Sequence, residues 1–177
     1  MPSSDTLSPT LDPAAAHLEP GAMELAHRHL VAKILAELTH ERLFAPQAVA
    51  GHVDTWVVRT DDATTYRFRG RVHRLEHWTI DPASIERRAG AELVAVDALD
   101  AVVDLAPTLG IPDALLPVYL EEVASTLQSA AWKRRHHRLS SADLVHADLP
   151  TIEAAMTEGH PAFIANNGRI GFSLEDF

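Results

Sequence analysis

The segment from Gly159 to Arg169 holds the residues best suited to binding an anion. Gly159 allows the left-handed backbone that ends a helix, and Pro161 holds His160 in an extended conformation that fixes where the imidazole points. Asn167-Gly168 is a tight-turn dipeptide that can present backbone N–H groups, and Arg169 adds a fork of donors suited to phosphate or carboxylate. Together they predict an anion site built from an imidazole, amide donors and a guanidinium.

An ordinary hairpin is the alternative interpretation of the same residues. Asn-Gly between apolar residues is the strongest short-range hairpin signal, and Phe163-Ile164 and Ile170 to Phe172 provide such flanks. The two interpretations are compatible, because the tip of a hairpin can hold an anion.

The elements that must position this segment begin with an amphipathic helix predicted over Ala22 to Leu43, which Pro46 would end. A change to alternating β-branched and aromatic residues then predicts a hairpin, with strands over Val53 to Arg59 and Thr64 to Trp78. On the second strand, Tyr66 and Phe68 share one face, and Arg67 and Arg69 share the other.

From Asp81 onward the pattern is mainly helical. Asp81-Pro82 is typical of a helix start, and Asp97 to Leu109 forms an amphipathic helix that Gly110 would end. Three further helices are predicted; they run from an Asp113 N-cap to about Arg134, from Ser140 or Ser141, and from Pro150 to Glu158.

This order of elements predicts an α+β fold, mainly helical with a small antiparallel sheet. Residues 1–20 are rich in Pro, Ser, Asp and Ala and are expected to be a disordered leader. Residues 21–150 would form one α+β domain.

Composition limits the classes of function. The chain has 177 residues, no cysteine and a formal net charge of −10. The absence of cysteine excludes disulfides and thiolate metal ligands and fits a cytoplasmic location. The acidic balance is opposite to that of a general nucleic-acid binder, and no apolar run approaches the length of a membrane span.

The segment around His160 resembles the signature of the NRPS-independent siderophore synthetases, the aerobactin-synthetase-like (IucA/IucC) family. The common form of that signature is Gly-His-Pro-x-His-Pro-x-x-Lys-x-Arg-x-Gly-Phe. The residues at matching offsets include His160, Pro161, Arg169, Gly171 and Phe172. The segments Tyr119 to Gln128 and Ala36 to Glu41 are also similar. Phe163-Ile164 replaces the second His-Pro and Asn167 replaces Lys, which removes one cation.

The resemblance implies an N-terminal portion of a longer enzyme. Residues 21–150 would be its thumb-like region, and residues 151–177 would be the start of its nucleotide-binding fingers region. Enzymes of this family use Mg-ATP to adenylate a carboxylate, often citrate-like, which an amine or an alcohol then attacks. It implies that one wall of the ATP site is formed by His160, Asn166, Asn167, Gly168 and Arg169. Most catalytic residues would lie outside this chain, so the fragment is expected to be inactive alone. Expected partners are the two substrates and a second copy, or the missing C-terminal portion.

Several other features permit different functions. A non-catalytic assembly or dimerisation module related to the family is the main alternative. The 11 histidines suggest metal binding, but His73 and His77 fall in an extended segment, where positions i and i+4 are far apart. The basic run from Lys133 to Arg138 is interpreted as a solvated helix end that could also hold an anion, and the three tryptophans as core residues.

Overall fold

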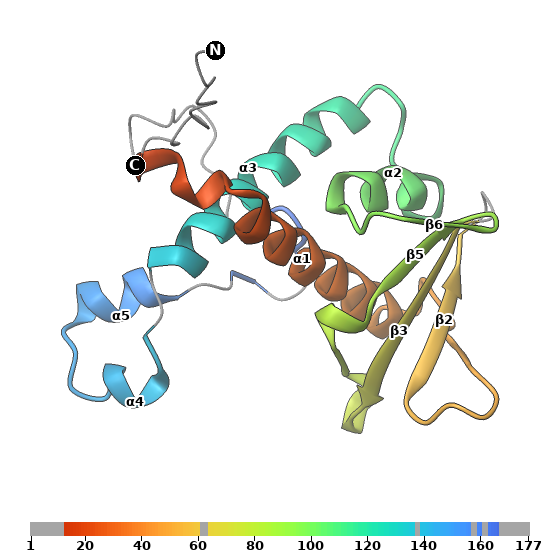
Figure 1. Cartoon of the computed structure of the whole chain (residues 1–177), viewed down its shortest axis with the longest axis horizontal. Coiled ribbons are helices and arrows are strands. Elements are labelled where there is room, and N and C mark those ends of the chain that lie inside the picture. The colour runs from red at the N-terminus through yellow and green to blue at the C-terminus, as the bar shows by residue number, and fades with distance from the viewer. Residues whose placement is uncertain (1–12, 61–63, 137–138, 157–158, 161–162, 167–177) are drawn as a thin grey trace, which may run out of the picture.

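The computed structural model describes residues 13–60, 64–136, 139–156, 159–160 and 163–166 (Figure 1). The helices in this part of the chain are α1 (Pro20–His40), α2 (Ala98–Leu109), α3 (Leu116–His136), α4 (Ser141–Leu144) and α5 (Leu149–Ala155). The strands are β1 (Gln47–Ala48), β2 (Thr55–Arg59), β3 (Thr64–Val72), β4 (Trp78–Ile80), β5 (Glu86–Ala89) and β6 (Glu92–Val94). Short 3-10 helices are η1 (Pro13–Leu18), η2 (Arg74–Glu76) and η3 (Pro82–Ser84). The α+β architecture predicted from the sequence is therefore confirmed.

The sheet is antiparallel throughout, in the order β1-β2-β3-β5-β6, and β4 pairs with the far end of β3. The predicted hairpin is present: Trp56 pairs with Phe68, and Val58 pairs with Tyr66. Tyr66 and Phe68 are both buried, as their shared face predicts. The second strand ends at Val72 rather than at Trp78, because η2 interrupts it.

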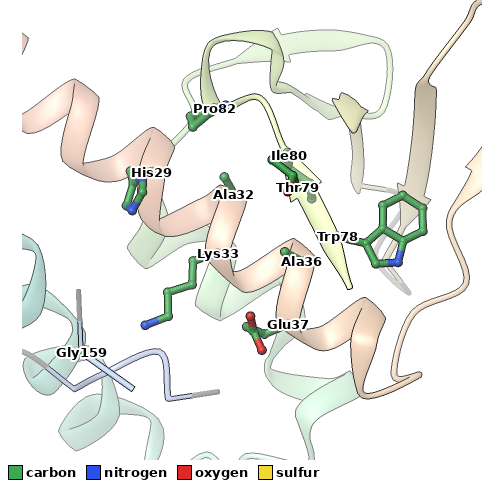
Figure 2. Close-up of a pocket in the computed structure, with 10 residues that line it drawn as sticks. All are labelled: His29, Ala32, Lys33, Ala36, Glu37, Trp78, Thr79, Ile80, Pro82 and Gly159. Carbon is green, nitrogen blue, oxygen red and sulfur yellow. The ribbon is translucent and has the colours of Figure 1, made fainter. Parts of the chain in front are cut away.

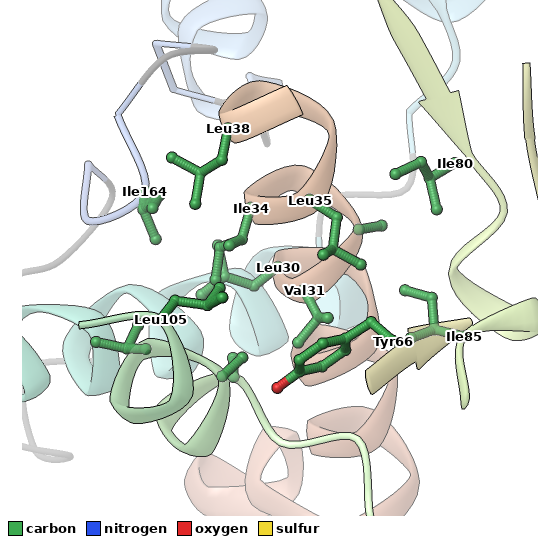
Figure 3. Packing of buried hydrophobic residues seen from close by; sticks show 14 of the residues in the cluster. Leu30, Val31, Ile34, Leu35, Leu38, Tyr66, Ile80, Ile85, Leu105 and Ile164 are labelled. Atoms are coloured by element: carbon green, nitrogen blue, oxygen red, sulfur yellow. The ribbon is translucent and has the colours of Figure 1, made fainter. Parts of the chain in front are cut away.

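Helix α1 lies at the centre of the molecule, beside the sheet and crossed by α3 (Figure 1). None of its residues from Ala26 to His40 is exposed. Its apolar side chains meet Tyr66, Leu105 and Ile164 in one continuous core (Figure 3). An amphipathic surface helix keeps one face in water, whereas this helix is surrounded by protein over most of its length.

The polar residues of α1 consequently bind neighbouring segments. The N–H of Ala98 donates to Nδ1 of His27 at 3.0 Å, which adds a second cap to the start of α2. Arg28 donates to the carbonyl oxygens of Pro82 and Ile85 at 3.4 and 3.1 Å, which holds η3 against the helix. Each such side chain replaces lost water by a protein partner, as burial of a polar group requires.

Helices α2 and α4 begin as their sequences predict. The Asp97 carboxylate accepts from the N–H groups of Leu99 and Asp100, and Gly110 ends α2 with a φ of 64°. Ser140, the first of the two candidates, caps α4 in a capping box with Asp143.

Five predicted elements differ from the structure. The region after Asp81 is not helical at first: a 3-10 turn leads into the β5–β6 hairpin. Residues 13–18, expected within the leader, form η1 and pack on α3. Helix α1 ends at His40, before Leu43. Helix α3 begins at Leu116, so Asp113 lies in the turn before it, and α5 spans Leu149–Ala155 rather than Pro150 to Glu158.

The hairpin β5–β6 is tied to α2 by a buried charge network. Arg87 on β5 donates to both carboxylate oxygens of Asp104, at 2.9 and 3.1 Å, and to Asp100 at 2.8 Å. The hydroxyl of Tyr66 also donates to Asp104. The side chains of Arg87 and Asp104 are each 12% exposed. Burial and the hydrogen bond to Asp104 raise the pKa of Tyr66 above its ordinary value.

This raised pKa predicts a loss of stability at high pH. Because the unfolded chain releases the Tyr66 proton near pH 10 and the folded chain retains it, the free energy of unfolding should fall as pH rises above about 10. Tyr66 alone contributes a slope of about 1.4 kcal/mol per pH unit. Urea unfolding followed by circular dichroism between pH 8 and 11.5 measures that slope.

The matched variant is Tyr66→Phe, which leaves the Arg87–Asp104 pair intact. It should reduce the slope above pH 10 by about 1.4 kcal/mol per unit, while costing about 1 kcal/mol at pH 8. The chain has two tyrosines and two lysines, so few other groups titrate in this range. Equal slopes in the two proteins would contradict the assignment.

Candidate functional site

Part of the predicted anion-binding segment is described by the structure. Gly159, His160 and residues 163–166 are placed, whereas Asn167, Gly168 and Arg169 lie outside the described residues. Two of the five predicted site residues, His160 and Asn166, can therefore be examined in three dimensions.

The backbone carbonyl of His160 accepts two side-chain hydrogen bonds. Nζ of Lys33, on α1, donates to it at 2.9 Å, and Nδ2 of Asn166 donates to it at 2.6 Å. Lys33 and His160 are 127 positions apart in the chain. A charged donor makes a stronger hydrogen bond than a neutral one, so this contact fixes the start of the segment to the central helix. We call these three residues the His160 clamp.

Close packing around Gly159 and Ile164 supports the His160 clamp. A Cβ atom at Gly159 would lie 2.6 to 2.8 Å from the carboxamide atoms of Asn166, so the space there admits a glycine without displacement. The His160 and Phe163 rings lie 4.7 Å apart, centroid to centroid. Ile164 is 7% exposed and joins the main core. The segment is thus held at both ends of its described part.

A cavity of about 490 Å³ separates this segment from the sheet (Figure 2). His29, Lys33 and Glu37 recur at four-residue intervals on α1 and form one side of it. The opposite side carries Trp78, Thr79 and Ile80 of β4 together with Pro82, and Gly159 reaches the rim. The cavity combines an ammonium, an imidazole and a carboxylate with an apolar wall.

The carboxylate of Glu37 makes no hydrogen bond or ion pair with any residue that the structure describes. A partly buried carboxylate in such a setting can accept from an ammonium or amine of a ligand. Lys33 and His29 give the same cavity donors for an anion. The described residues therefore provide binding groups of both signs, which suits a polar ligand better than an apolar one.

The histidines at positions 73 and 77 contact different neighbours. Nε2 of His73 lies 3.0 Å from Oγ1 of Thr79, whereas the ring of His77 stacks on His40 at 4.2 Å. Within the described ranges, no group of three or more potential ligand residues is placed to hold a metal ion.

The basic run at the end of α3 and the tryptophans mainly support the fold. Lys133 donates to the carbonyl of Met156 at 3.2 Å, and Arg135 lies 3.5 Å from Glu19, so the basic end of α3 contacts neighbouring segments. Residues 137–138 of that run lie outside the described part. Trp56 and Trp78 pack edge to face at 4.9 Å against the core, as predicted for core residues.

Sequence reasoning missed Lys33 and the second role of Asn166. Lys33 lies between the buried residues Ala32 and Ile34, and a lysine is costly at such a position unless its ammonium has a partner. This burial is visible only in the structure, because the sequence pattern of α1 predicts an amphipathic helix with a solvated lysine. The chain contains two lysines, and both donate to backbone carbonyls of later segments.

Comparison with known proteins finds relatives of this chain. No protein-family model matches the chain. It is 44% identical over 176 residues to a putrebactin synthase of Shewanella sp. strain MR-4, covering 96% of this chain and 28% of the relative. It is 32% identical over 158 residues to an aerobactin synthase of Vibrio mimicus, covering 86% of this chain and 25% of that enzyme. The chain thus spans about a quarter of the length of these curated relatives.

Solved structures agree with the sequence comparison. The aerobactin synthetase IucC of Klebsiella pneumoniae superposes with a TM-score of 0.76 at 26% identity, over 88% of this chain and 27% of that one. The petrobactin biosynthesis protein AsbB of Bacillus anthracis shares the fold, with a TM-score of 0.69 at 16% identity, over 94% of this chain and 28% of its own. The chain is therefore related to the NRPS-independent siderophore synthetases, the aerobactin-synthetase-like (IucA/IucC) family, and corresponds to an N-terminal portion of them.

The His160 clamp predicts that Lys33→Met loosens one segment of an otherwise intact fold. Methionine keeps the length of the side chain but cannot donate to the His160 carbonyl. Amide hydrogen exchange, followed by mass spectrometry, should accelerate about tenfold or more in residues 159–166, corresponding to about 1.4 kcal/mol, while α2 and α3 keep their protection.

The matched control is Lys133→Met, which removes the chain's other lysine-to-carbonyl hydrogen bond, at Met156. It should accelerate exchange near α5 and leave the segment after Gly159 unchanged. Identical exchange of residues 159–166 in wild type and Lys33→Met would show that the contact does not hold the segment.

Proposed function

We propose that the chain is the N-terminal portion of an ATP-dependent siderophore synthetase. Such an enzyme would activate a citrate-like carboxylate by adenylation and condense it with an amine or an alcohol, in the cytoplasm. The observation that carries the proposal is the 44% identity with a putrebactin synthase, which extends over 176 residues. The anchored segment after Gly159 supports it, because that is where the family signature falls.

The hydrogen-bond donors of the cavity and of the segment after Gly159 suit an anionic cofactor. The described part offers the imidazole of His29 and the ammonium of Lys33 in the lining of one cavity. His160 adds an imidazole next to Gly159, which reaches the rim of that cavity. Triphosphate binding uses such cations together with amide donors. In our proposal, Asn167, Gly168 and Arg169 continue this wall beyond the described residues. Mg²⁺-ATP, when bound, would supply the adenylyl group and the leaving AMP.

The chain's own residues would bind and orient rather than react. In the proposal, His160 and Arg169 hold phosphate oxygens, while Asn166 fixes the His160 carbonyl so that the imidazole keeps one direction. Glu37, across the cavity from β4, is placed to accept from an amine. We assign no general acid, base or nucleophile to this chain, and we expect the isolated chain to have no adenylation activity.

This proposal predicts weak binding of Mg-ATP that depends on Arg169. Isothermal titration of the full 177-residue chain should detect binding, and Arg169→Ala should weaken it by at least tenfold, because a guanidinium–phosphate contact is lost. Arg135→Ala, which removes an arginine from the end of α3, is the control and should bind as the wild type does.

If neither wild type nor Arg169→Ala binds Mg-ATP while both are folded by circular dichroism, the segment does not form an ATP half-site in this chain. If the wild type and Arg169→Ala bind Mg-ATP with the same affinity, Arg169 does not have the role assigned to it. Measurable adenylation by the pure chain would overturn its expected inactivity.

A second candidate function, an assembly module, is favoured by the α4–α5 arm, which we define as residues 139–156. Helices α4 and α5 project away from the body of the molecule (Figure 1), and neither makes an extensive contact with another element. Helices of four and seven residues are too short to be stable alone. Four apolar side chains of the arm are at least 47% exposed: Leu139, Val145, Leu149 and Met156. We propose that a second copy of the chain covers them in a homodimer.

Light scattering coupled to size-exclusion chromatography tests the assembly candidate. The wild type should dimerise at micromolar concentration, and Val145→Ser with Leu149→Ser should be monomeric, because the variant loses buried apolar area. The control pair is Leu93→Ser with Val103→Ser, at similarly exposed sites outside the arm, and should remain dimeric. A wild type that is monomeric at 1 mM would contradict this candidate.

A further inference from the structure

The outer face of the sheet, opposite to the core, carries a row of arginines. Successive residues of β3 alternate between the two faces, so the burial of Tyr66 and Phe68 places Arg67, Arg69 and Arg71 on the opposite side. Residues two apart on a strand are separated by roughly 6.6 Å, which spaces the three guanidinium groups regularly along β3.

The neighbouring strands extend this row to both sides. Thr65 on β3 pairs with Arg59 of β2 and with Arg88 of β5, and residues that pair across strands share a face. Five of the fifteen basic lysine and arginine residues of the chain therefore lie on one sheet face. We call it the arginine face: Arg59, Arg67, Arg69, Arg71 and Arg88.

Carboxylates neutralise part of the arginine face. Glu86 lies 3.6 Å from Arg67, and Asp81 lies 2.5 Å from Arg69. Arg59 and Arg71 are exposed and make no hydrogen bond or ion pair with any residue in the described ranges. Arg88 donates to the carbonyl of Ala91 at 3.3 Å and has no carboxylate partner in the described part of the chain. A local positive charge therefore remains on a chain whose net charge is −10.

The surface of the arginine face is hollowed along β3. A hollow of about 290 Å³ is lined by His52, Arg67, Arg69, Ser84 and Glu86. A second, of about 750 Å³, is lined by Asp54, Arg69, Arg71, His73 and Asp81 among others. Arg69 borders both, so the two hollows follow the direction of the strand.

Packing leaves this face uncovered by the described helices. Arg87, which points to the inner face, reaches α2 through Asp104, and the aromatic residues of β3 pack in the core with α1. The residues that alternate with them, Arg69 and Arg71, are exposed. Five like charges on one sheet are unfavourable unless a partner of opposite charge compensates them.

We propose that the arginine face is a docking surface for an extended, acidic segment of a partner protein. The partner's carboxylates would pair with Arg59, Arg71 and Arg88, whose guanidinium groups suit planar, bidentate contacts. An extended segment that lies along β3 would place alternate side chains at the same spacing as the arginines. The interaction is independent of ATP binding and of catalysis.

The charge of the whole chain favours a polypeptide over a nucleic acid. At −10 the protein repels a polyphosphate at long range, and the positive field that general nucleic-acid binding requires is absent. An acidic segment of a few residues carries much less charge. Asp54, Asp81 and Glu86, which line the hollows, can also accept from the backbone N–H groups of a peptide, which a phosphate strand does not offer.

The experiment is a ¹⁵N NMR titration of the full chain with a ten-residue peptide of alternating glutamate and serine, which carries about half the charge of a ten-nucleotide strand. We expect shift changes that concentrate on β3 and on Arg59 and Arg88, with saturable binding. Arg71→Glu should weaken the binding by at least tenfold, and Arg71→Lys by less, because lysine keeps the charge but loses the planar fork. Arg135→Glu changes the net charge equally at the far end of α3 and should leave the affinity within about twofold.

Three results would overturn the proposal. The first is no shift change on β3 at 1 mM peptide. The second is equal weakening by Arg71→Glu and Arg135→Glu, which would indicate a response to net charge alone. The third is tighter binding of a ten-nucleotide oligouridine at the same residues, which would make RNA the occupant. The spectra also show directly whether each variant is folded, so a loss of binding cannot be confused with unfolding.

Discussion

The burial of α1 is the constraint on which the rest of the structure depends. From Ala26 to His40 no residue of this helix is exposed, and several of its polar side chains bind partners in other segments. His27 caps α2, Arg28 holds η3, and Lys33 holds the carbonyl of His160. The same requirement that stabilises the fold therefore positions the segment that matches the family signature.

Local signals in the sequence predicted the elements that local interactions determine. The β2–β3 hairpin follows from alternation, and the ends of α2 follow from an Asp cap and a left-handed glycine. The β5–β6 hairpin could not be predicted in this way, because its strands have four and three residues and carry Arg87 and Arg88 side by side. Arg87 lies in a strand because it contacts Asp104 across the sheet–helix interface, which is a tertiary interaction.

The candidate site also has one part that local sequence signals predicted and one part that depends on tertiary contacts. The residue types of the terminal segment, together with the family resemblance, indicated where binding chemistry would lie. The His160 clamp was not predictable, because Lys33 and His160 are 127 positions apart and nothing local to either one requires the contact. An apparently amphipathic helix also implies a solvated lysine, and only the packing of α1 on several sides changes that expectation. The polar face of α1 lines the cavity because the remaining faces are committed to the core.

The chain buries a complete core, but two of its surfaces lack the contacts that would cover them. The core is one continuous cluster that joins α1, the sheet, α2 and α3, so the body of the molecule has the contacts that a folded domain needs. The α4–α5 arm and the arginine face are not covered by other parts of the described chain. The arm exposes apolar side chains, whereas the arginine face exposes like charges. Apolar area is best covered by a large complementary surface, whereas guanidinium groups call for directed carboxylates. In our proposal a second copy of the chain covers the arm, whereas three arginines without a carboxylate partner in the described part of the chain call for an acidic sequence in particular. The two surfaces therefore require different partners.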